Sequence, residues 1–312
     1  MKKLLLKMLV CPSCLPEEIE LRAEIIHEQI GDIVEGTLNC SRCGGVYPVE
    51  NGIAFLDPAV HRKERPASKY ETASVLSSYL WSHYGDILGD REASSAYSEW
   101  AALINGGVGM ALDIGSAVGR FAFEMSRNSD FVVGIDNSAS FIQSARELMV
   151  HGRKQVALRQ EGLLSHEETL TLPVAWQTDK VEFIVADALA LPFRSRTFTA
   201  LASLNLIDKV PHPLKHLHEM NRVARDRAAQ LLLSDPFSWS TETAREEDWL
   251  GGKDNGPCSG RGMDNIIALL QGENRQLLPA WRIVRQGHVW WKIRNHANHF
   301  ELIRSCFVKA DR

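Results

Sequence analysis

Short apolar runs separated by turn residues and amphipathic stretches dominate the chain after residue 100. Four of these runs have the length and composition of strands buried on both faces of a sheet: residues 110–114, 131–135, 181–185 and 198–205. The first run leads through a turn of small residues into the start of a helix, and a helical pattern over residues 214–223 follows the fourth. This order predicts a Rossmann-like α/β fold.

The first 57 residues have a different pattern, in which strand-like runs are interrupted by glycine turns. Residues 36–38 and 46–49 are typical of strands, Gly44-Gly45 turns the chain, and Asn51-Gly52 is a strong hairpin signal. These residues therefore predict a small β-rich unit in front of the α/β domain.

The boundary between the two units lies in a polar, proline-bracketed segment over residues 57–69. We therefore predict three parts: the β-rich unit over residues 1–60, a linker over 61–69 and the α/β domain over 70–312.

Composition and charge narrow the class of protein. A chain of 312 residues with 45% hydrophobic content can bury one good-sized core and a small appendage. A formal net charge of -4 provides no general attraction to nucleic acid or to anionic lipid. Lys7 interrupts the apolar run at the start of the sequence, and no stretch approaches the ~20 apolar residues of a membrane span. We therefore expect a cytoplasmic protein with no membrane partner and a small-molecule substrate, and the charge disfavours a nucleic-acid partner; its oligomeric state is not indicated.

Four N-terminal cysteines form two CxxC pairs, Cys11 with Cys14 and Cys40 with Cys43. Each pair places two thiolates on one tight turn, so a hairpin between the pairs predicts a closed tetrahedral site for one structural Zn²⁺. A pair of disulfides is the alternative. We expect loss of the zinc to unfold the ribbon and to leave the cofactor-binding fold largely intact.

The N-terminal pattern is similar to a known family. Residues 6–14 and 38–53, with the two CxxC pairs and the Tyr47-Pro48-Val49 run, resemble the small zinc-ribbon family that activates RNA and protein methyltransferases. In that family the ribbon is a partner or stabiliser, so the resemblance implies a methyltransferase elsewhere.

The turn after the first α/β strand predicts a cofactor site. Asp113, Gly115, Ser116 and Gly119 surround a tight turn of small residues, where a ligand can approach the backbone closely. Asp136 ends the next strand, where a carboxylate can accept hydrogen bonds from both hydroxyl groups of a ribose. An NAD-binding Rossmann turn is the rival interpretation.

The later strand ends favour S-adenosylmethionine over NAD. The third strand ends at Asp187-Ala188 and the fourth at Asn205, an order that resembles class I S-adenosylmethionine-dependent methyltransferases. The resemblance implies that Asp187 faces the adenine amino group. The predicted cofactor-binding residues are Asp113, Gly115, Ser116, Gly119, Asp136, Asn137, Asp187, Ala188 and Asn205.

Several segments outside these motifs carry a closer resemblance. Residues 79–85, 160–162, 205–210, 234–239 and 249–252 look like the 4-mercaptohistidine N-methyltransferase domain of ovothiol-synthesising enzymes. Lys209 and Asp235 depart from that family, in which arginine and a small or neutral residue are expected. The sulfoxide synthase part of those enzymes is absent, and the zinc ribbon stands in its place.

The predicted catalytic residues are Asp208, Asn205 and Tyr84. Methyl transfer from a sulfonium is an in-line displacement, so positioning the acceptor matters more than a strong base. Asp208 could orient an imidazole or ammonium group, Asn205 could bind the cofactor or substrate, and Tyr84 could contact a carboxylate from a helix that covers the site. The alternatives are that Asp208 caps the following helix and that Tyr84 belongs to a buried helical stripe.

Four tryptophans are candidates either for substrate contact or for packing in the core. Trp239 and Trp249 could wall a small aromatic or cationic substrate. Trp290 and Trp291 are interpreted as candidates for the core.

These patterns predict a methyltransferase that modifies an imidazole nitrogen, or a related atom, of a small histidine-derived substrate. An RNA or protein methyltransferase that uses the ribbon for recruitment is the alternative, and a non-catalytic module is a third. The intact Asp113, Gly115, Asp136 and Asp187 speak against a module without activity.

Overall fold

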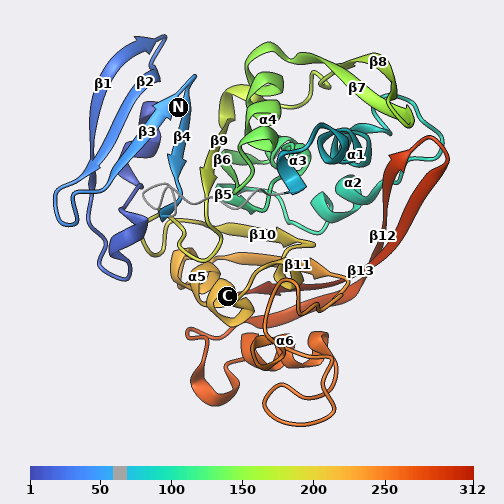
Figure 1. The fold of residues 1–312 in the computed structure, drawn as a ribbon. Helices are drawn as coiled ribbons and strands as arrows, with labels where there is room; N and C mark the ends of the chain where they lie inside the picture. Colours follow the sequence, from blue (N-terminus) through green and yellow to red (C-terminus); the bar gives the residue numbers. More distant parts are fainter. Residues whose placement is uncertain (59–68) are drawn as a thin grey trace.

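A computed structural model describes residues 1–58 and 69–312, so most of the predicted linker over 61–69 lies outside the described residues. Within them, one large sheet has the strand order β1-β2-β3-β4-β9-β6-β5-β10-β11-β13-β12, and β7 and β8 form a separate hairpin (Figure 1). The strands are β1 (Leu21–Gln29), β2 (Asp32–Cys40), β3 (Val46–Glu50), β4 (Ile53–Leu56), β5 (Val108–Ile114), β6 (Ser129–Asp136), β7 (Arg153–Glu161), β8 (Leu164–Thr171), β9 (Val181–Ala186), β10 (Ala200–Leu204), β11 (Gln230–Asp235), β12 (Arg282–His296) and β13 (His299–Asp311).

The N-terminal unit is the predicted β-rich ribbon. Strands β1 to β4 pair antiparallel in sequence order. The predicted hairpin turn joins β3 to β4 at Asn51 and Gly52, whose φ angles of 50° and 76° lie in the left-handed region. Asparagine and glycine tolerate this region best, which explains why the chain reverses there.

The second unit is an α/β domain with a parallel centre. Strands β9, β6, β5, β10 and β11 pair in parallel, and β13 adds antiparallel to β11 and carries β12 at its edge. The four strands predicted from apolar runs are β5, β6, β9 and β10. The hairpins β7–β8 and β12–β13 were not predicted.

Helices cover both faces of this sheet. Figure 1 shows α1 to α4 grouped on one side of the central strands and α5 and α6 on the other, and an apolar cluster fills each side. The helices are α1 (Ala73–Tyr84), α2 (Ala96–Ala101), α3 (Arg120–Met125), α4 (Ala139–His151), α5 (Pro213–Val223) and α6 (Gly262–Leu270). No helix in the described part of the chain is long and apolar enough to cross a membrane.

The two units share one sheet, because β4 of the ribbon pairs in parallel with β9. Phe55 lies opposite Val185 and Leu56 opposite Ala186. Apolar side chains of the ribbon, such as Leu38, also belong to the same buried cluster as those of β6 and β9. The ribbon is therefore packed onto the strand that leads into the predicted adenine site.

Candidate active site

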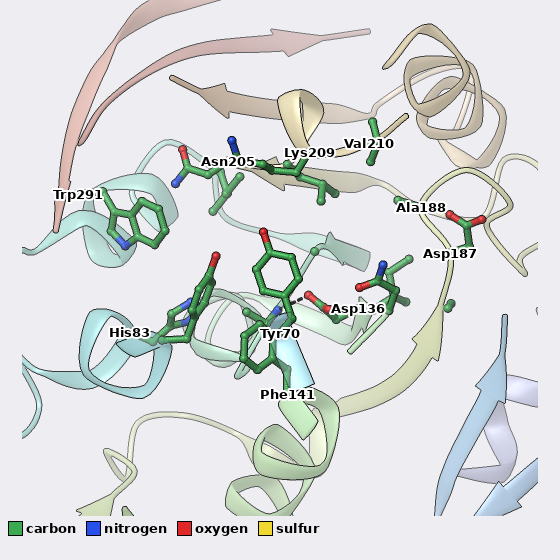
Figure 2. Close-up of a pocket in the computed structure, with 18 of the residues that line it drawn as sticks. Tyr70, His83, Asp136, Phe141, Asp187, Ala188, Asn205, Lys209, Val210 and Trp291 are labelled. Carbon is green, nitrogen blue, oxygen red and sulfur yellow. Dashed lines mark hydrogen bonds between the residues drawn. The ribbon is translucent and has the colours of Figure 1, made fainter. Parts of the chain in front are cut away.

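A cavity lies at the carboxyl ends of the parallel strands, where an open α/β sheet binds its ligands. Its floor comes from the residues at the ends of β5, β6, β9 and β10, and its cover comes from the segment before α1, from α1 and α2, and from β12 (Figure 2). The floor includes Gly115, Asp136, Asn137, Asp187, Ala188 and Asn205, and the cover includes Tyr70, Tyr79, His83, Tyr97 and Trp291.

The turn after β5 lines the cavity at Gly115 and packs closely against Leu206. Gly115 has a φ of 77°, and a Cβ atom there would lie 3.0 Å from the side chain of Leu206. Ala117 takes the place of the middle glycine of a dinucleotide turn with a φ of 46°. Its N–H donates a hydrogen bond of 3.0 Å to Asp136, which ties the turn to the tip of β6.

Asp136 lies at the tip of β6 with both carboxylate oxygens already accepting backbone hydrogen bonds. Ala117 N–H donates to Oδ2, and Ser138 N–H donates to Oδ1 at 2.9 Å. Burial raises the pKa of Asp136 to about 6, while these hydrogen bonds act in the opposite direction. The group is therefore mostly ionised at pH 7 and able to accept from hydroxyl donors.

The adenine end of the cavity follows β9. Asp187 accepts a hydrogen bond of 2.8 Å from Leu189 N–H, and burial raises the pKa of its carboxyl group. Asp57 of the ribbon is the next contributor to this increase. The ribbon therefore influences the electrostatics of this end directly.

Three of the predicted cofactor-binding residues lie behind the cavity wall. Asp113 and Ser116 are almost fully buried, and neither they nor Gly119 line the cavity. Burial raises the pKa of Asp113 to about 8. Gly119 begins α3 with a φ of 89°, and a Cβ atom there would lie 2.6 Å from the ring of Phe183. In the structure these residues support the turn, and their contact with a cofactor stays a prediction.

Aromatic side chains enclose the other end of the cavity. Tyr79 packs against Phe141 with a centroid distance of 4.7 Å and against Trp291 at 6.2 Å. His83 Nε2 and the Tyr97 hydroxyl form a hydrogen bond of 2.6 Å. Burial lowers the pKa of His83 well below its usual value, so its imidazole is neutral at pH 7.

The structure also corrects the role predicted for Tyr84. Its side chain is fully buried, it does not line the cavity, and its hydroxyl donates a hydrogen bond of 2.7 Å to the carbonyl oxygen of Val118. Tyr84 therefore belongs to the buried stripe of α1. Its neighbour His83 and the preceding Tyr79 reach the cavity instead.

Asn205 and Asp208 follow β10, but only Asn205 lines the cavity. Asn205 has a φ of 54°, and its Oδ1 accepts a hydrogen bond of 2.6 Å from the Ser305 hydroxyl. The Asp208 side chain is fully buried, and its Oδ2 accepts from Lys209 Nζ at 3.1 Å and from Ser238 N–H at 2.8 Å. Asp208 therefore lies behind Lys209, which does line the cavity.

The tryptophans are arranged differently from the prediction. Trp239 and Trp249 stack on each other with a centroid distance of 6.5 Å outside the cavity wall. Trp291 lines the cavity, while Trp290 is 48% exposed, because successive side chains of β12 point to opposite faces. The sequence did not reveal Trp291, Tyr70 or Tyr97 as site residues, since each comes from a segment outside the strand ends.

The four N-terminal cysteines form a cluster suited to a metal ion. Their Sγ atoms all lie within 4.8 Å of one another, with 3.6 Å between Cys11 and Cys43 and 3.7 Å between Cys14 and Cys40. Tetrahedral thiolates around zinc at ~2.3 Å are separated by about 3.8 Å. The cysteines are free, so the disulfide alternative is wrong, and the donor set fits Zn²⁺.

Comparisons with known proteins define the class. Residues 112–229 match the family described as Methyltransferase domain, and residues 2–52 match the family described as Trm112p-like protein. The chain thus combines a class I methyltransferase domain with a Trm112p-like ribbon, and it is an S-adenosylmethionine-dependent methyltransferase. No curated protein sequence matches it.

Solved structures with a similar fold have low sequence identity. A methyltransferase from Methanosarcina mazei is 17% identical, with a TM-score of 0.43 and coverage of 68% of this chain and 95% of that chain. One from Aquifex aeolicus is 14% identical, with a TM-score of 0.44 and coverage of 78% and 98%. A chain from a complex that contains the Haloferax volcanii Trm112 methyltransferase activator is 12% identical, with a TM-score of 0.45 and coverage of 79% and 99%.

The cavity fits S-adenosylmethionine, the cofactor of this class. Gly115, Asp187 and Ala188 line the cavity, and Asp136 presents a carboxylate at the tip of β6 that would accept hydrogen bonds from the ribose of a bound cofactor. When bound, the cofactor supplies a methyl group whose leaving group departs neutral.

Proposed function

We propose that this methyltransferase modifies a ring nitrogen, or a related atom, of a small histidine-derived molecule, with imidazole and mercaptohistidine-like compounds as the favoured class. The aromatic end of the cavity is the observation that carries the proposal. Tyr79, Tyr97 and Trp291 line this end. Flat aromatic faces suit a heteroaromatic ring, and they attract the positive charge that an imidazole gains when it is methylated.

Unpaired polar atoms at the same end also support a nitrogen-containing acceptor. His83 Nδ1 and Trp291 Nε1 are buried and have no hydrogen-bond partner among the described residues, and both residues line the cavity. A buried polar atom without a partner costs about 1–3 kcal/mol. An acceptor with ring nitrogens can supply the missing partners, which would also fix its orientation.

The neutral state of His83 suits this role. A neutral imidazole can accept or donate a hydrogen bond without placing a positive charge next to a sulfonium. The acceptor nitrogen can then use its lone pair to form the new N–C bond, and no strong base in the protein is required.

The alternative is an RNA or protein substrate recruited by the ribbon. Strand β4 of the ribbon is paired with β9 of the same chain, so this edge already serves the chain's own catalytic domain. The net charge of -4 also provides no general attraction to RNA. The pairing shows where the ribbon packs within the chain, and the net charge favours the small-molecule interpretation over RNA.

Labelled S-adenosylmethionine tests the proposal directly. The purified enzyme is incubated with histidine, mercaptohistidine or a thiol-bearing analogue, in parallel with bulk RNA and protein, and label is separated by size. We expect label in the small-molecule fraction, with the Asp136→Ala variant as the control for enzyme-dependent transfer. Label that appears only in macromolecules would contradict the proposal.

Trp291 provides a second test with a matched control. Trp291→Ala removes one wall of the aromatic end, and we expect the KM for the acceptor to increase about tenfold, the scale of one aromatic contact, while the affinity for S-adenosylhomocysteine stays within twofold. Trp290→Ala changes the exposed neighbour on β12 and is expected to leave both values unchanged. If the two substitutions changed the KM for the acceptor equally, Trp291 would have no specific role in binding the acceptor.

A further inference from the structure

Lys209 is the one positively charged side chain among the described residues that line the cavity. Figure 2 shows it between Trp291 and Asp187, with Asn205 and Val210 as its neighbours in the picture. Its side chain is 38% exposed, and its ammonium group donates to Asp208 Oδ2 at 3.1 Å. Because an ammonium has three donors, two remain for a ligand in the cavity.

A buried pair of carboxyl groups holds Lys209 from behind. Asp208 follows β10 and Asp235 ends β11, and both side chains are fully buried. Asp208 Oδ2 is anchored by Ser238 N–H at 2.8 Å, and Asp235 Oδ1 is anchored by Phe237 N–H at 2.7 Å. The two backbone anchors are one residue apart, so a single short segment fixes both carboxyl groups.

The remaining oxygens of the two groups have no hydrogen-bond partner. Asp208 Oδ1 and Asp235 Oδ2 are both buried and unpaired among the described residues. Two adjacent carboxylates cannot both stay ionised in a buried site. Burial, and after it the charge of Asp208, raises the pKa of Asp235 well above its usual value. A proton on Asp235 would remove the charge of one of the two buried carboxyl groups.

We propose that Asp208 and Asp235 share one proton, and that this pair presents the Lys209 ammonium as the group that binds a carboxylate on the methyl acceptor. The inference rests on the proposed small-molecule function and adds to it the requirement for an acidic substituent. With one proton shared, the pair and Lys209 have no net charge, so burying them together costs less than burying two ionised carboxylates.

The arrangement assigns separate roles to the residues at this end. The aromatic side chains contact the ring of the acceptor, and Lys209 binds its carboxylate on the side of Asn205. Asp208 and Asp235 do not touch the acceptor, so they are positioning residues that act through Lys209.

Acceptors with and without a carboxylate test the assignment of Lys209. KM is measured for histidine and for histamine with the wild type, Lys209→Met and Lys209→Arg, and the dissociation constant of S-adenosylhomocysteine is measured by calorimetry. We expect Lys209→Met to raise the KM for histidine at least tenfold and that for histamine less than twofold, while Lys209→Arg preserves both. Cofactor affinity should stay within twofold in every variant.

Each contrary result has a distinct meaning. Equal KM changes for both acceptors, or a loss of affinity confined to S-adenosylhomocysteine, would overturn the assignment of Lys209 and leave the proposed function standing. A wild-type enzyme that labels no small molecule would contradict the proposed function, and this inference with it.

Asp235 variants test the shared proton. Asp235→Asn keeps a neutral group that can donate to Asp208 Oδ1, whereas Asp235→Leu removes that donor. We expect Asp235→Asn to keep the wild-type preference for histidine over histamine, and Asp235→Leu to reduce this preference at least fivefold. If Asp235→Asn reduces it as much as Asp235→Leu does, an ionised Asp235 is required and the shared proton is excluded.

Discussion

We expect Asp136 to set the pH range in which the cofactor is bound. Its pKa of about 6 is raised by burial, and only the ionised group accepts hydrogen bonds from both ribose hydroxyls. As the pH falls through 6 the group becomes protonated. We therefore expect the affinity for S-adenosylhomocysteine to be constant above pH 7 and to fall by up to about tenfold per pH unit below pH 6. Calorimetry between pH 5 and 8 measures this directly.

Substitutions at Asp136 separate this effect from a general acid sensitivity. Asp136→Ala removes a charge-assisted acceptor and should cost about 2 kcal/mol of binding free energy at pH 7.5. Asp136→Asn should lose the pH dependence between 5 and 7. An unchanged affinity in Asp136→Ala would place the ribose elsewhere.

The buried carboxyl group of Asp113 makes the stability of the folded protein depend on pH. Its pKa of about 8 in the folded protein exceeds the usual value of an aspartate, so the folded state holds a proton that the unfolded state releases. The contribution of Asp113 to the free energy of unfolding is therefore largest at low pH and falls as the pH rises towards 8. Asp113→Asn removes this dependence. The gain in melting temperature of the variant over the wild type should grow between pH 6 and 8.

The controls for Asp113 use the protein without cofactor. If Asp113→Asn raises the melting temperature by the same amount at pH 6 and at pH 8, the folded wild type does not hold a proton on Asp113. The variant should also keep its affinity for S-adenosylhomocysteine, because Asp113 does not line the cavity.

Site residues can be predicted from the sequence when they directly follow the strands of a parallel sheet. Asp136, Asp187 and Asn205 follow strands of a parallel sheet, so their position at one edge could be predicted. The direction of Asp208 and Tyr84 could not, because it depends on Ser238 and Val118, which come from other segments. The aromatic wall escaped prediction for a similar reason, since Trp291 lies about two hundred residues after Tyr79.

Two elements of the ribbon hold the loop that follows β9. Strand β4 pairs along β9 on one side. On the other side, Val10 N–H donates to Pro192 O at 2.9 Å and Arg194 N–H donates to Met8 O at 2.9 Å. Cys11, a predicted zinc ligand, follows Val10 directly. The zinc site is therefore connected through backbone hydrogen bonds to the loop that contains Asp187.

This connection changes the expected effect of zinc removal. The sequence predicted that loss of zinc would leave the cofactor fold intact, but a disordered ribbon would also release the adenine loop. We expect Cys40→Ser, or treatment with a chelator, to weaken binding of S-adenosylhomocysteine about tenfold or more.

Metal content by mass spectrometry and calorimetry on the same sample check the prediction. Cys258→Ser lies outside the cluster and serves as the control. Full cofactor affinity in a sample without zinc would show that the two sites are independent.

The hairpins β7–β8 and β12–β13 could not be predicted from the sequence. In β12 the residues Arg282, Arg285 and Arg294 interrupt the apolar residues, so no run of strand length stands out in the sequence. The strand is specified by pairing with β13 over its whole length. Such pairing is a long-range property that local patterns do not reveal.

A buried ion cluster joins the two halves of the molecule. Arg146 of α4 pairs with Glu182 of β9 and, at 3.1 Å, with Asp32 of the ribbon. The Arg146 side chain is 9% exposed and that of Glu182 is fully buried. Removing the arginine would leave the buried carboxylate with only the backbone N–H donors of Lys2 and Phe183, and breaking a buried ion pair costs about 3–5 kcal/mol.

We therefore expect the ribbon and the methyltransferase domain to unfold in one transition. All eight tryptophans lie at or after residue 81, so tryptophan fluorescence reports on the methyltransferase domain alone. Release of zinc to a coloured chelator reports on the ribbon. The two melting curves should coincide in the wild type, and Arg146→Ala should move both to lower temperature. Zinc release well before the fluorescence change in the wild type would contradict a single transition.

The shared strand pair between β4 and β9 also determines which ribbon the enzyme can use. A partner carried on the same chain is present at an effective concentration on the order of millimolar. A separate ribbon protein at micromolar concentration would have to bind about a thousandfold more tightly to replace it. We therefore expect the enzyme to use the ribbon of its own chain in preference to a separate ribbon protein.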